Sequence, residues 1–209
     1  MTFTLYHYWR SSCSWRVRWA LFYKGLDFTP IAINLLENEQ TSAEHLKKNP
    51  KGAVPALALN DQNKTVLFES SAIIEFLEET HPSPRLLPKD PLQRAHCRAL
   101  TQIVNAGIQP LQNLATMKFY SEDPEKRKSW SAHWIQEGLK AYEAAVQKSA
   151  GEFSCGNELS MADLFLIPQL YNARRFDVDL TPFPSCLKIE GNALKTESCQ
   201  KAHPDRFTP

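Results

Sequence analysis

Apolar and polar positions divide the chain into two parts with different periodicity. Residues 3–8, FTLYHY, and 28–34, FTPIAIN, are rich in aromatic and β-favouring side chains and predict two strands. Between them, from Ser12 to Lys24, apolar side chains recur round the turns of a helix, and Gly25 supplies its C-terminal stop. The pattern therefore predicts a strand–helix–strand unit at the start of the chain.

A second group of elements follows a polar segment. Residues 53–59, AVPALAL, and 65–68, TVLF, flank the turn residues NDQNK and predict a hairpin, after which Ser70 opens an amphipathic helix. Pro55 interrupts the first strand, where a proline removes a ladder donor. Two interpretations stay open for Pro55: a cis Val54–Pro55 bond at the strand entrance, or a trans proline at a strand edge, which is the far commoner state.

From residue 81 onward the pattern changes. Residues 81–91, HPSPRLLPKDP, hold four prolines without periodicity and indicate a linker. Beyond it the pattern predicts a long helix over 92–120, another over 124–149, and a third that begins at Ser160. Ser160 and Asp163 have the spacing of a capping box, with Asp in place of the usual Glu or Gln.

The end of the chain carries weaker signals. After about Phe183 the sequence predicts a terminal helix followed by a frayed tail, with residues 203–209, HPDRFTP, disordered in the absence of a partner. The whole order, βαβ, then ββα, then helices alone, is that of an α/β thioredoxin-like domain joined to an all-α domain. We expect a thioredoxin-like domain over 1–81, a linker over 82–91 and a helical domain over 92–209.

Composition excludes several classes of function. The 209 residues are 43% hydrophobic, and 24 basic against 23 acidic residues leave no basic footprint of a nucleic-acid binder. The opening residues lack the features of a signal peptide, and no apolar run approaches the roughly 18 residues of a membrane span. Five cysteines without a CxxC motif argue against a disulfide framework or a zinc site and for a reducing cytosol. None of the six histidines has a metal-binding spacing.

The segment WRSSCSWRVRWAL, residues 9–21, lies where the first strand runs into the first helix. A thioredoxin-like fold uses this loop for thiol chemistry, because the helix N-terminus stabilises an anion there. Cys13 lies in the loop, but the positions three residues away are Arg10 and Arg16. Disulfide exchange by a CxxC pair is therefore excluded.

Several motifs resemble those of the cytosolic glutathione transferases, and within them the zeta class, which includes maleylacetoacetate and maleylpyruvate isomerases. SSCS followed by RVR and the run ARRFDVDLTPFP are specific markers of that class. The resemblance covers nearly the whole chain. The resemblance rests on the segments RSSCSWRVRWAL, NPKGAVPAL, ESSAIIEFLEE, PRLLP, IQPLQN and SMADLFLIPQLYNARRFDVDLTPFP.

The resemblance implies roles for three residues of the first loop. Ser11 matches the catalytic serine, whose hydroxyl donates to the glutathione sulfur and favours the thiolate. The substrate of such isomerases carries carboxylates, which Arg10, immediately before the serine pair, is expected to bind, and Cys13 is expected beside the sulfur in a supporting position. Without the resemblance, Ser11 reads as a plain helix N-cap.

The resemblance also implies a set of glutathione contacts. Glu69 and Ser70 hold the γ-glutamyl end at a helix N-terminus, with Glu69 standing where many zeta members carry Gln. Val54, preceding a cis Pro55, pairs through its main chain with the cysteinyl part.

Three further positions match polar contacts of the family. Gln40 matches a contact to the glycyl end, and Gln109 and Asn113, one turn apart on the first long helix, match another polar contact. As plain sequence, Gln109 and Asn113 read as helix-surface residues. Lys51 departs from the pattern, since related sequences usually place Gln nearby, and it receives no role.

Among the remaining basic residues, one arginine is expected to bind substrate and the others to be structural. Arg175 matches the substrate-side arginine, and arginine suits a carboxylate because its guanidinium binds bidentately. Arg174 points to another helix face, and Arg16 and Arg18 are expected to make structural or interface ion pairs. His7 is expected to be packed.

The implied activity is the glutathione-dependent cis–trans isomerisation of a maleyl diketo acid, maleylacetoacetate to fumarylacetoacetate, in phenylalanine and tyrosine breakdown. Glutathione is regenerated and acts as a cofactor. Alternatives of the same fold are a maleylpyruvate isomerase, a conjugating or dehalogenating transferase, or a non-enzymatic regulatory protein. The family implies a homodimer. The cysteines favour a cytoplasmic location, and composition, hydropathy and histidine spacing give no expectation of a nucleic-acid partner, a membrane partner or a metal.

Overall fold

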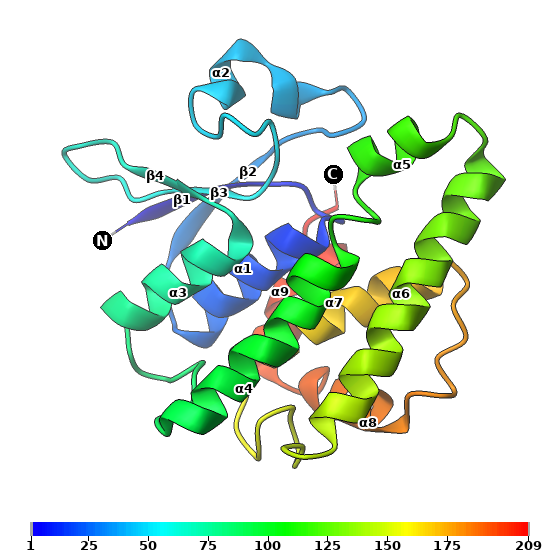
Figure 1. Ribbon diagram of the computed structural model, residues 1–209. Helices are drawn as coiled ribbons and strands as arrows, with labels where there is room; N and C mark the ends of the chain where they lie inside the picture. The colour runs from blue at the N-terminus through cyan, green and yellow to red at the C-terminus, as the bar shows by residue number, and fades with distance from the viewer. Residues whose placement is uncertain (1, 209) are drawn as a thin grey trace. The chain divides into compact units, whose positions relative to one another are not determined.

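The computed structural model describes residues 2–208 and divides the chain into two units. One unit comprises the chain up to Arg85 together with the segment from Thr196 onward, and the other runs from Leu86 to Lys195. The sequence assigned the last segment to the helical domain, whereas the structure groups it with the N-terminal unit. Figure 1 colours this segment red.

The first unit is built on a mixed sheet in the order β2-β1-β3-β4. β1 pairs parallel with β2 and antiparallel with β3, which pairs antiparallel with β4. The strands are β1 (Phe3–His7), β2 (Phe28–Ala32), β3 (Ala56–Ala58) and β4 (Val66–Phe68). Two helices, α1 (Ser12–Tyr23) and α3 (Ser70–Thr80), cover one face of the sheet (Figure 1). This arrangement confirms the thioredoxin-like fold.

The polar segment between β2 and β3 holds two short elements that the pattern did not predict. They are η1 (Glu39–Thr41), a single 3₁₀ turn, and α2 (Ala43–Leu46), which Ser42 caps by accepting from the N–H of His45. Elements of three or four residues carry too little periodicity to be recognised in a sequence.

Helix α1 is the centre of the first unit's core. Trp15, Val17 and Trp19 are at most 2% exposed, and the guanidinium-bearing Arg16 and Arg18 are fully buried beside them. The sheet, α3 and α9 (Glu197–Ala202) surround α1, so that no side of it forms a polar stripe. A helix buried on all sides shows no clear amphipathic pattern, so the burial of its two arginines could not be predicted from periodicity.

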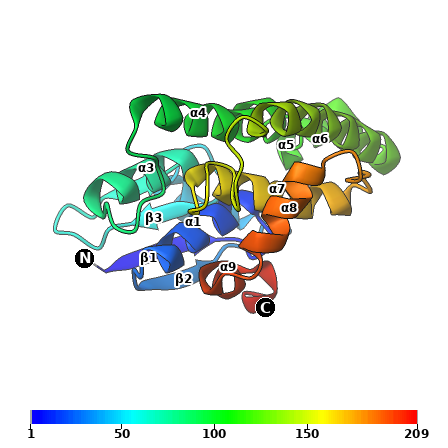
Figure 2. The same ribbon diagram turned by 90° about the horizontal axis from the view of Figure 1, so that it is seen from below.

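The C-terminal segment is folded as far as it is described, to Thr208, so the prediction of a frayed tail is wrong for residues 203–208, and Pro209 lies outside the described residues. Helix α9 and the turn η3 (Pro204–Arg206) follow one another beside α1 (Figure 2). The indole N–H of Trp19 donates to Ser198 Oγ over 3.0 Å, and the His203 ring meets the edge of Trp15. These partners lie near the other end of the sequence, so a local pattern could not reveal them.

The second unit contains only helices. They are α4 (Pro91–Gln102), the π-helical turn η2 (Ile103–Ile108), α5 (Leu114–Tyr120), α6 (Pro124–Val146), α7 (Met161–Arg175) and α8 (Pro184–Ala193). The predicted helix over 92–120 is therefore two helices. Pro110 has no N–H to continue the first of them, and Asn113 begins the second by accepting from the N–H of Ala115.

Two local features explain how these helices pack. A Cβ at Gly138 of α6 would overlap the side chain of Ile108, so the glycine permits the close approach of α6 to η2. The capping box predicted at the start of α7 is confirmed, because the Asp163 carboxylate accepts from the N–H of Ser160 over 2.8 Å. Asp163 is fully buried and fixes the first turn of α7.

None of the helices among residues 2–208 combines the length and the apolar character needed to cross a membrane.

Candidate active site

Three chain segments meet at one edge of the sheet. Tyr6 of β1 pairs with Ala56 of β3, which pairs with Phe68 of β4. The loop after β1, the residues before β3 and the residues after β4 therefore lie at the same edge. These segments carry Arg10 and Ser11, Val54 and Pro55, and Glu69 and Ser70.

Ser11 is the N-cap of α1. Its Oγ accepts from the N–H of Ser14 over 3.2 Å, and its own N–H donates to the carbonyl of Tyr8 over 3.1 Å. No residue described between 2 and 208 accepts the Ser11 hydroxyl proton. The plain cap that the sequence allowed is present, and it leaves the hydroxyl able to donate to a ligand at the positive end of the helix.

The two neighbours that the sequence singled out are half-buried. The Arg10 guanidinium lies 5.2 Å from the centre of the Trp9 ring. Cys13 lies in the first turn of α1 and is a free thiol. Both side chains therefore remain within reach of a ligand at the helix N-terminus.

The N-terminus of α3 is joined to α1 by a residue that the sequence did not assign to the site. Arg16, fully buried, donates through Nη1 to Ser70 Oγ over 3.2 Å. Burial lowers the pKa of Arg16, and the charges of Cys13 and Glu69 oppose that shift. This hydroxyl contact places a cation next to an anion-binding helix terminus.

Glu69 has an unusual main chain and an ionic partner. Its φ of 66° lies in a region that L-residues seldom adopt, at a cost on the order of 1–3 kcal/mol. Its carboxylate accepts from Lys51 Nζ over 2.7 Å, with both side chains about half exposed. Lys51, to which the sequence gave no role, is thus the ionic partner of Glu69.

The Val54–Pro55 bond is cis, the state that the resemblance implied and that the sequence alone disfavoured. His45 Nε2 and Asn49 Nδ2 lie 2.8 and 2.9 Å from the carbonyl oxygen of Ala53 and hold the preceding loop. No hydrogen bond joins the main chain of Val54 to another residue in the described range 2–208. Its N–H and C=O are available for an extended peptide ligand.

Gln40 borders the same loop. A Cβ at Gly52, whose φ is +62°, would lie 3.3 Å from the carbonyl oxygen of Gln40, so the glycine permits this close approach. Gln40 Oε1 is buried and has no hydrogen-bond partner among the described residues. A buried oxygen of this kind calls for a donor.

These groups suit a glutathione molecule lying along the edge. Ser70 and Arg16 offer a hydroxyl and a cation to a carboxylate, and Glu69 offers a carboxylate to an ammonium. Val54 offers peptide groups and Ser11 a hydroxyl for a sulfur. The donor and acceptor types at this edge therefore match those of the tripeptide.

Arg18, on α1, holds the loop that carries Arg10 and Ser11 through hydrogen bonds to its main chain. Arg18 Nη2 donates to the carbonyl of Trp9 over 2.9 Å, and Nε donates to the carbonyl of Ala202 in α9 over 3.2 Å. Its Nη1 lies 3.1 Å from Nδ1 of His7. Burial first, and then the charge of Arg18, lower the pKa of His7 to about 4. His7 is packed, as the sequence predicted.

Three predicted site residues belong to the second unit. Gln109, in the turn after η2, accepts from Gln112 Nε2 over 3.3 Å, whereas Asn113 caps α5. The expectation that Gln109 and Asn113 lie one turn apart on one helix is wrong, because the helix does not continue through Pro110, which lacks an N–H. Arg175 is exposed at the end of α7, where its Nη1 donates to Asn172 Oδ1 over 3.1 Å.

Arg174 differs from its neighbour Arg175. It forms a bidentate pair with Glu190 of α8, with N–O distances of 2.6 and 2.5 Å. That pair fixes Arg174 to α8, as expected for a residue on another face of α7. No group of three or more His, Cys, Asp or Glu side chains suited to a metal ion occurs within residues 2–208.

Two family models match the chain. The model described as the glutathione S-transferase N-terminal domain matches residues 1–79, and the C-terminal domain model matches residues 110–190. A maleylacetoacetate isomerase of Rattus norvegicus is 45% identical over 204 residues, which are 97% of this chain and 92% of the relative.

Solved structures of similar proteins agree with these matches. Maleylacetoacetate isomerase from Anaeromyxobacter dehalogenans 2CP-1, with glutathione bound in its active site, is 44% identical, with a TM-score of 0.91 and coverage of 98% and 96% of the two chains. A bacterial maleylpyruvate isomerase of the zeta class is 37% identical, with a TM-score of 0.90 and 96% of each chain covered.

Proposed function

Because the chain belongs to the glutathione transferase family, and within it to the zeta class of maleylacetoacetate isomerases, we propose that it isomerises maleylacetoacetate to fumarylacetoacetate with glutathione as cofactor. Glutathione supplies the thiolate that adds to the cis double bond and leaves after the carbon skeleton has turned. The chain must therefore bind the tripeptide, favour its thiolate and hold a dicarboxylate.

One observation carries the proposal. Ser11 Oγ uses an acceptor site on its own helix, but its proton has no acceptor among residues 2–208. In this proposal the hydroxyl donates to the sulfur, and the N-terminus of α1 adds a favourable potential. Both contributions lower the pKa of a thiol at this position. Cys13 stays a neighbour of the sulfur and not the nucleophile.

The γ-glutamyl end is assigned to α3. The carboxylate would accept from Ser70 Oγ and from the first N–H groups of the helix, with Arg16 Nη1 3.2 Å from that hydroxyl. The ammonium would replace Lys51 as the ionic partner of Glu69, which breaks only a half-exposed pair. Exchange of one cation for another keeps the Glu69 charge neutralised.

The rest of the cofactor is assigned to the loop before β3 and to η1. Val54 would pair with the cysteinyl residue through its main chain, in the orientation set by the cis bond to Pro55. The buried Oε1 of Gln40 would accept an N–H near the glycyl end. Gln109 and Asn113 remain polar candidates of the second unit.

The dicarboxylate substrate is assigned to two arginines. Arg10 adjoins Ser11 in sequence, and Arg175 is exposed at the end of α7, where its Nη1 donates to Asn172 Oδ1. Arg175→Ala should raise the KM for the maleyl acid about tenfold, the loss of a charge-assisted hydrogen bond, and should leave the KM for glutathione unchanged. Initial rates at varied concentrations of each compound measure both constants. An equal rise in both constants would contradict the assignment.

The experiment that tests the function compares substrates directly. The purified chain is mixed with maleylacetoacetate or maleylpyruvate, with and without glutathione, and the loss of each cis isomer is followed by absorbance. We expect glutathione-dependent conversion with the higher kcat/KM for maleylacetoacetate, in line with 44–45% against 37% identity. Faster conversion of maleylpyruvate would reassign the substrate, and conversion of neither compound would refute the isomerase.

The proposal includes a cytoplasmic homodimer. The five cysteines are free thiols, which supports a reducing compartment. The dimer rests on the family resemblance, and sedimentation equilibrium of the purified chain tests it, since a monomer at micromolar concentration would contradict it.

A further inference from the structure

One buried arginine joins the loop before α1 to the C-terminal segment, residues 196–208. Arg18 of α1 is fully buried and donates through Nη2 to the carbonyl of Trp9 over 2.9 Å. Its Nε donates to the carbonyl of Ala202 in α9 over 3.2 Å, and its guanidinium carbon lies 4.6 Å from the centre of the Phe207 ring. The same side chain therefore contacts the loop and two residues near the end of the chain.

The peptide groups of Tyr8 connect Arg18 to Ser11. The carbonyl of Tyr8 accepts from the N–H of Ser11 over 3.1 Å and from Arg18 Nη1 over 3.4 Å. The N–H of Tyr8 donates to Ser14 Oγ, in the first turn of α1, over 3.3 Å. Because Arg18 and Ser11 share one acceptor, a shift of the guanidinium alters the main-chain bond that orients Ser11.

The hydrogen-bond partners of Arg18 are uncharged. They are main-chain carbonyls and Nδ1 of His7, and no carboxylate forms an ion pair with Arg18 among residues 2–208. Burial lowers the pKa of Arg18 to about 9, which leaves it a cation at neutral pH. Since no carboxylate fixes the guanidinium, its position depends on neutral neighbours, and the face of an aromatic ring attracts a cation. Phe207 supplies that ring.

The C-terminal segment has further contacts that hold it in place. The Phe207 ring meets the His7 ring in a T-shaped contact, with the ring centres 5.4 Å apart. Earlier in the segment, Ser198 Oγ accepts from the indole N–H of Trp19 over 3.0 Å. Figure 2 shows α9 beside α1. The segment is therefore fixed independently of Arg18 and can hold the guanidinium in turn.

We propose that Arg18 and Phe207 are positioning residues, through which the C-terminal segment holds Ser11 where its hydroxyl can donate to the glutathione sulfur. This role rests on the proposed function, which places that sulfur at Ser11. Phe207 places the guanidinium, the guanidinium places the Tyr8 peptide, and that peptide orients the Ser11 main chain. Neither positioning residue has to touch the cofactor.

The experiment titrates the thiolate absorbance of glutathione bound to the full chain against pH. Wild type is compared with Phe207→Ala and Phe207→Tyr, changes at a half-buried position near the end of the chain. A small displacement of a catalytic group weakens its contact with the reacting atom. We therefore expect Phe207→Ala to raise the thiol pKa by about half a unit and, at pH below that pKa, to lower kcat about threefold with the thiolate fraction. Phe207→Tyr keeps an aromatic face for the guanidinium and should retain the wild-type pKa.

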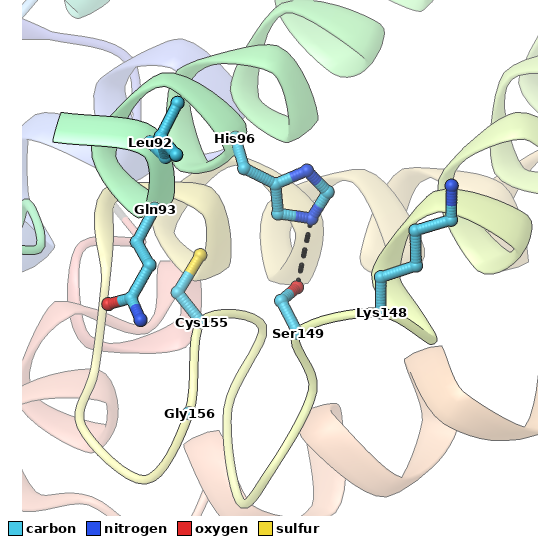
Figure 3. Close-up of a pocket in the computed structure, with 7 residues that line it drawn as sticks. All are labelled: Leu92, Gln93, His96, Lys148, Ser149, Cys155 and Gly156. Carbon is cyan, nitrogen blue, oxygen red and sulfur yellow. Dashed lines mark hydrogen bonds between the residues drawn. The ribbon is translucent and has the colours of Figure 1, made fainter. Parts of the chain in front are cut away.

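Ser149→Ala supplies a destabilised control in the second unit. Ser149 borders a pocket there, and Figure 3 shows its hydrogen bond with His96, over 3.0 Å. Its Oγ also donates to the carbonyl of Ser154 over 2.7 Å. Loss of these bonds should lower the free energy of unfolding and leave the thiol pKa unchanged. Equal rises of the thiol pKa in Ser149→Ala and Phe207→Ala would overturn the proposal, because lower stability alone would then account for both.

Amide hydrogen exchange measures the same coupling without glutathione. In the ligand-free chain, the Ser11 N–H should exchange about tenfold faster in Phe207→Ala than in wild type, and at the wild-type rate in Phe207→Tyr. Unchanged exchange in Phe207→Ala, or an unchanged thiol pKa, would overturn the positioning role and leave the glutathione site intact. Absence of a bound thiolate in wild type at every pH would instead contradict the proposed function, and the positioning role with it.

Discussion

The serines that precede helices α1 and α7 differ in whether the hydroxyl proton has an acceptor in the protein. Ser160 of α7 donates its hydroxyl proton to Asp163 Oδ2 over 2.7 Å. Ser11 of α1 accepts from the N–H of Ser14, and no residue described in 2–208 accepts its proton. The Ser160 hydroxyl therefore donates within the protein, whereas the Ser11 hydroxyl can donate to a ligand.

The difference comes from the third residue of each helix. That position holds Asp163 in α7, a carboxylate that accepts two bonds from Ser160, and Ser14 in α1, whose hydroxyl instead accepts from the N–H of Tyr8 over 3.3 Å. An acid three residues after the cap closes a capping box. The same cap residue is therefore structural or functional according to its partner at that position.

The groups that hold the two caps also have opposite charge. Asp163, a buried anion, fixes Ser160 and the loop at Ser154. Arg18, a buried cation, donates to the carbonyls of Tyr8 and Trp9, which precede Ser11, and makes no hydrogen bond to the Ser11 hydroxyl among the described residues. A guanidinium can hold a loop through carbonyl groups alone, because it has donors but no acceptor.

The largest effect should follow removal of the available hydroxyl. Ser11→Ala should reduce kcat by about 10²–10³-fold, the effect of losing one donor to a developing charge, and should reduce the free energy of unfolding by about 1 kcal/mol through loss of the cap. Steady-state kinetics and denaturant unfolding measure the two quantities. The matched variant Ser160→Ala should lower stability and leave kcat of the folded protein unchanged. A similar loss of kcat in both variants would remove the distinction.

The next effect concerns the anion that closes the second cap. Asp163→Ala should lower the free energy of unfolding by about 3 kcal/mol, because the N–H groups of Ser154 and Ser160 would lose their acceptor in a buried position. Asp163→Asn keeps one acceptor oxygen and should cost less. Urea unfolding of both variants gives the comparison, and equal stability of Asp163→Ala and wild type would contradict the account.

A smaller effect on the free energy of unfolding, limited to one range of pH, concerns His7, which lies beside Arg18 near the Ser11 cap. His7 has a pKa of about 4 in the folded chain against 6.5 unfolded, so only the unfolded chain gains this proton between the two values. Stability should therefore fall as pH decreases from 6.5 to 4, by as much as about 3 kcal/mol. His7→Asn keeps an acceptor toward Arg18 and should remove this part of the pH dependence. Identical unfolding profiles for wild type and variant would show that His7 contributes nothing.

The sequence predicted the parts of this comparison that depend on short-range pattern. The sequence of strands and helices along the first unit and the capping box of Ser160 and Asp163 follow from local periodicity and spacing. The prediction of a single helix over 92–120 was wrong because apolar periodicity continues across Pro110, although the hydrogen-bonded helix does not.

What the sequence missed depends on contacts between distant segments. Nothing in α1 itself reveals that Arg16 donates a hydrogen bond to Ser70 and Arg18 one to the carbonyl of Ala202. Lys51 gave no signal for its contact with Glu69. The roles of Ser11, Gln40 and Glu69 came from motif resemblance, and local chemistry alone would have assigned caps and surface residues.

The pKa of the thiol of bound glutathione tests the central claim most directly. The thiolate absorbance of the complex is titrated against pH for wild type, Ser11→Ala and Ser160→Ala at saturating glutathione. The account predicts a pKa well below that of free glutathione in wild type and Ser160→Ala, and a rise of at least about one unit in Ser11→Ala, which corresponds to the loss of one hydrogen bond to a charged group. The same low thiol pKa in all three proteins would contradict it.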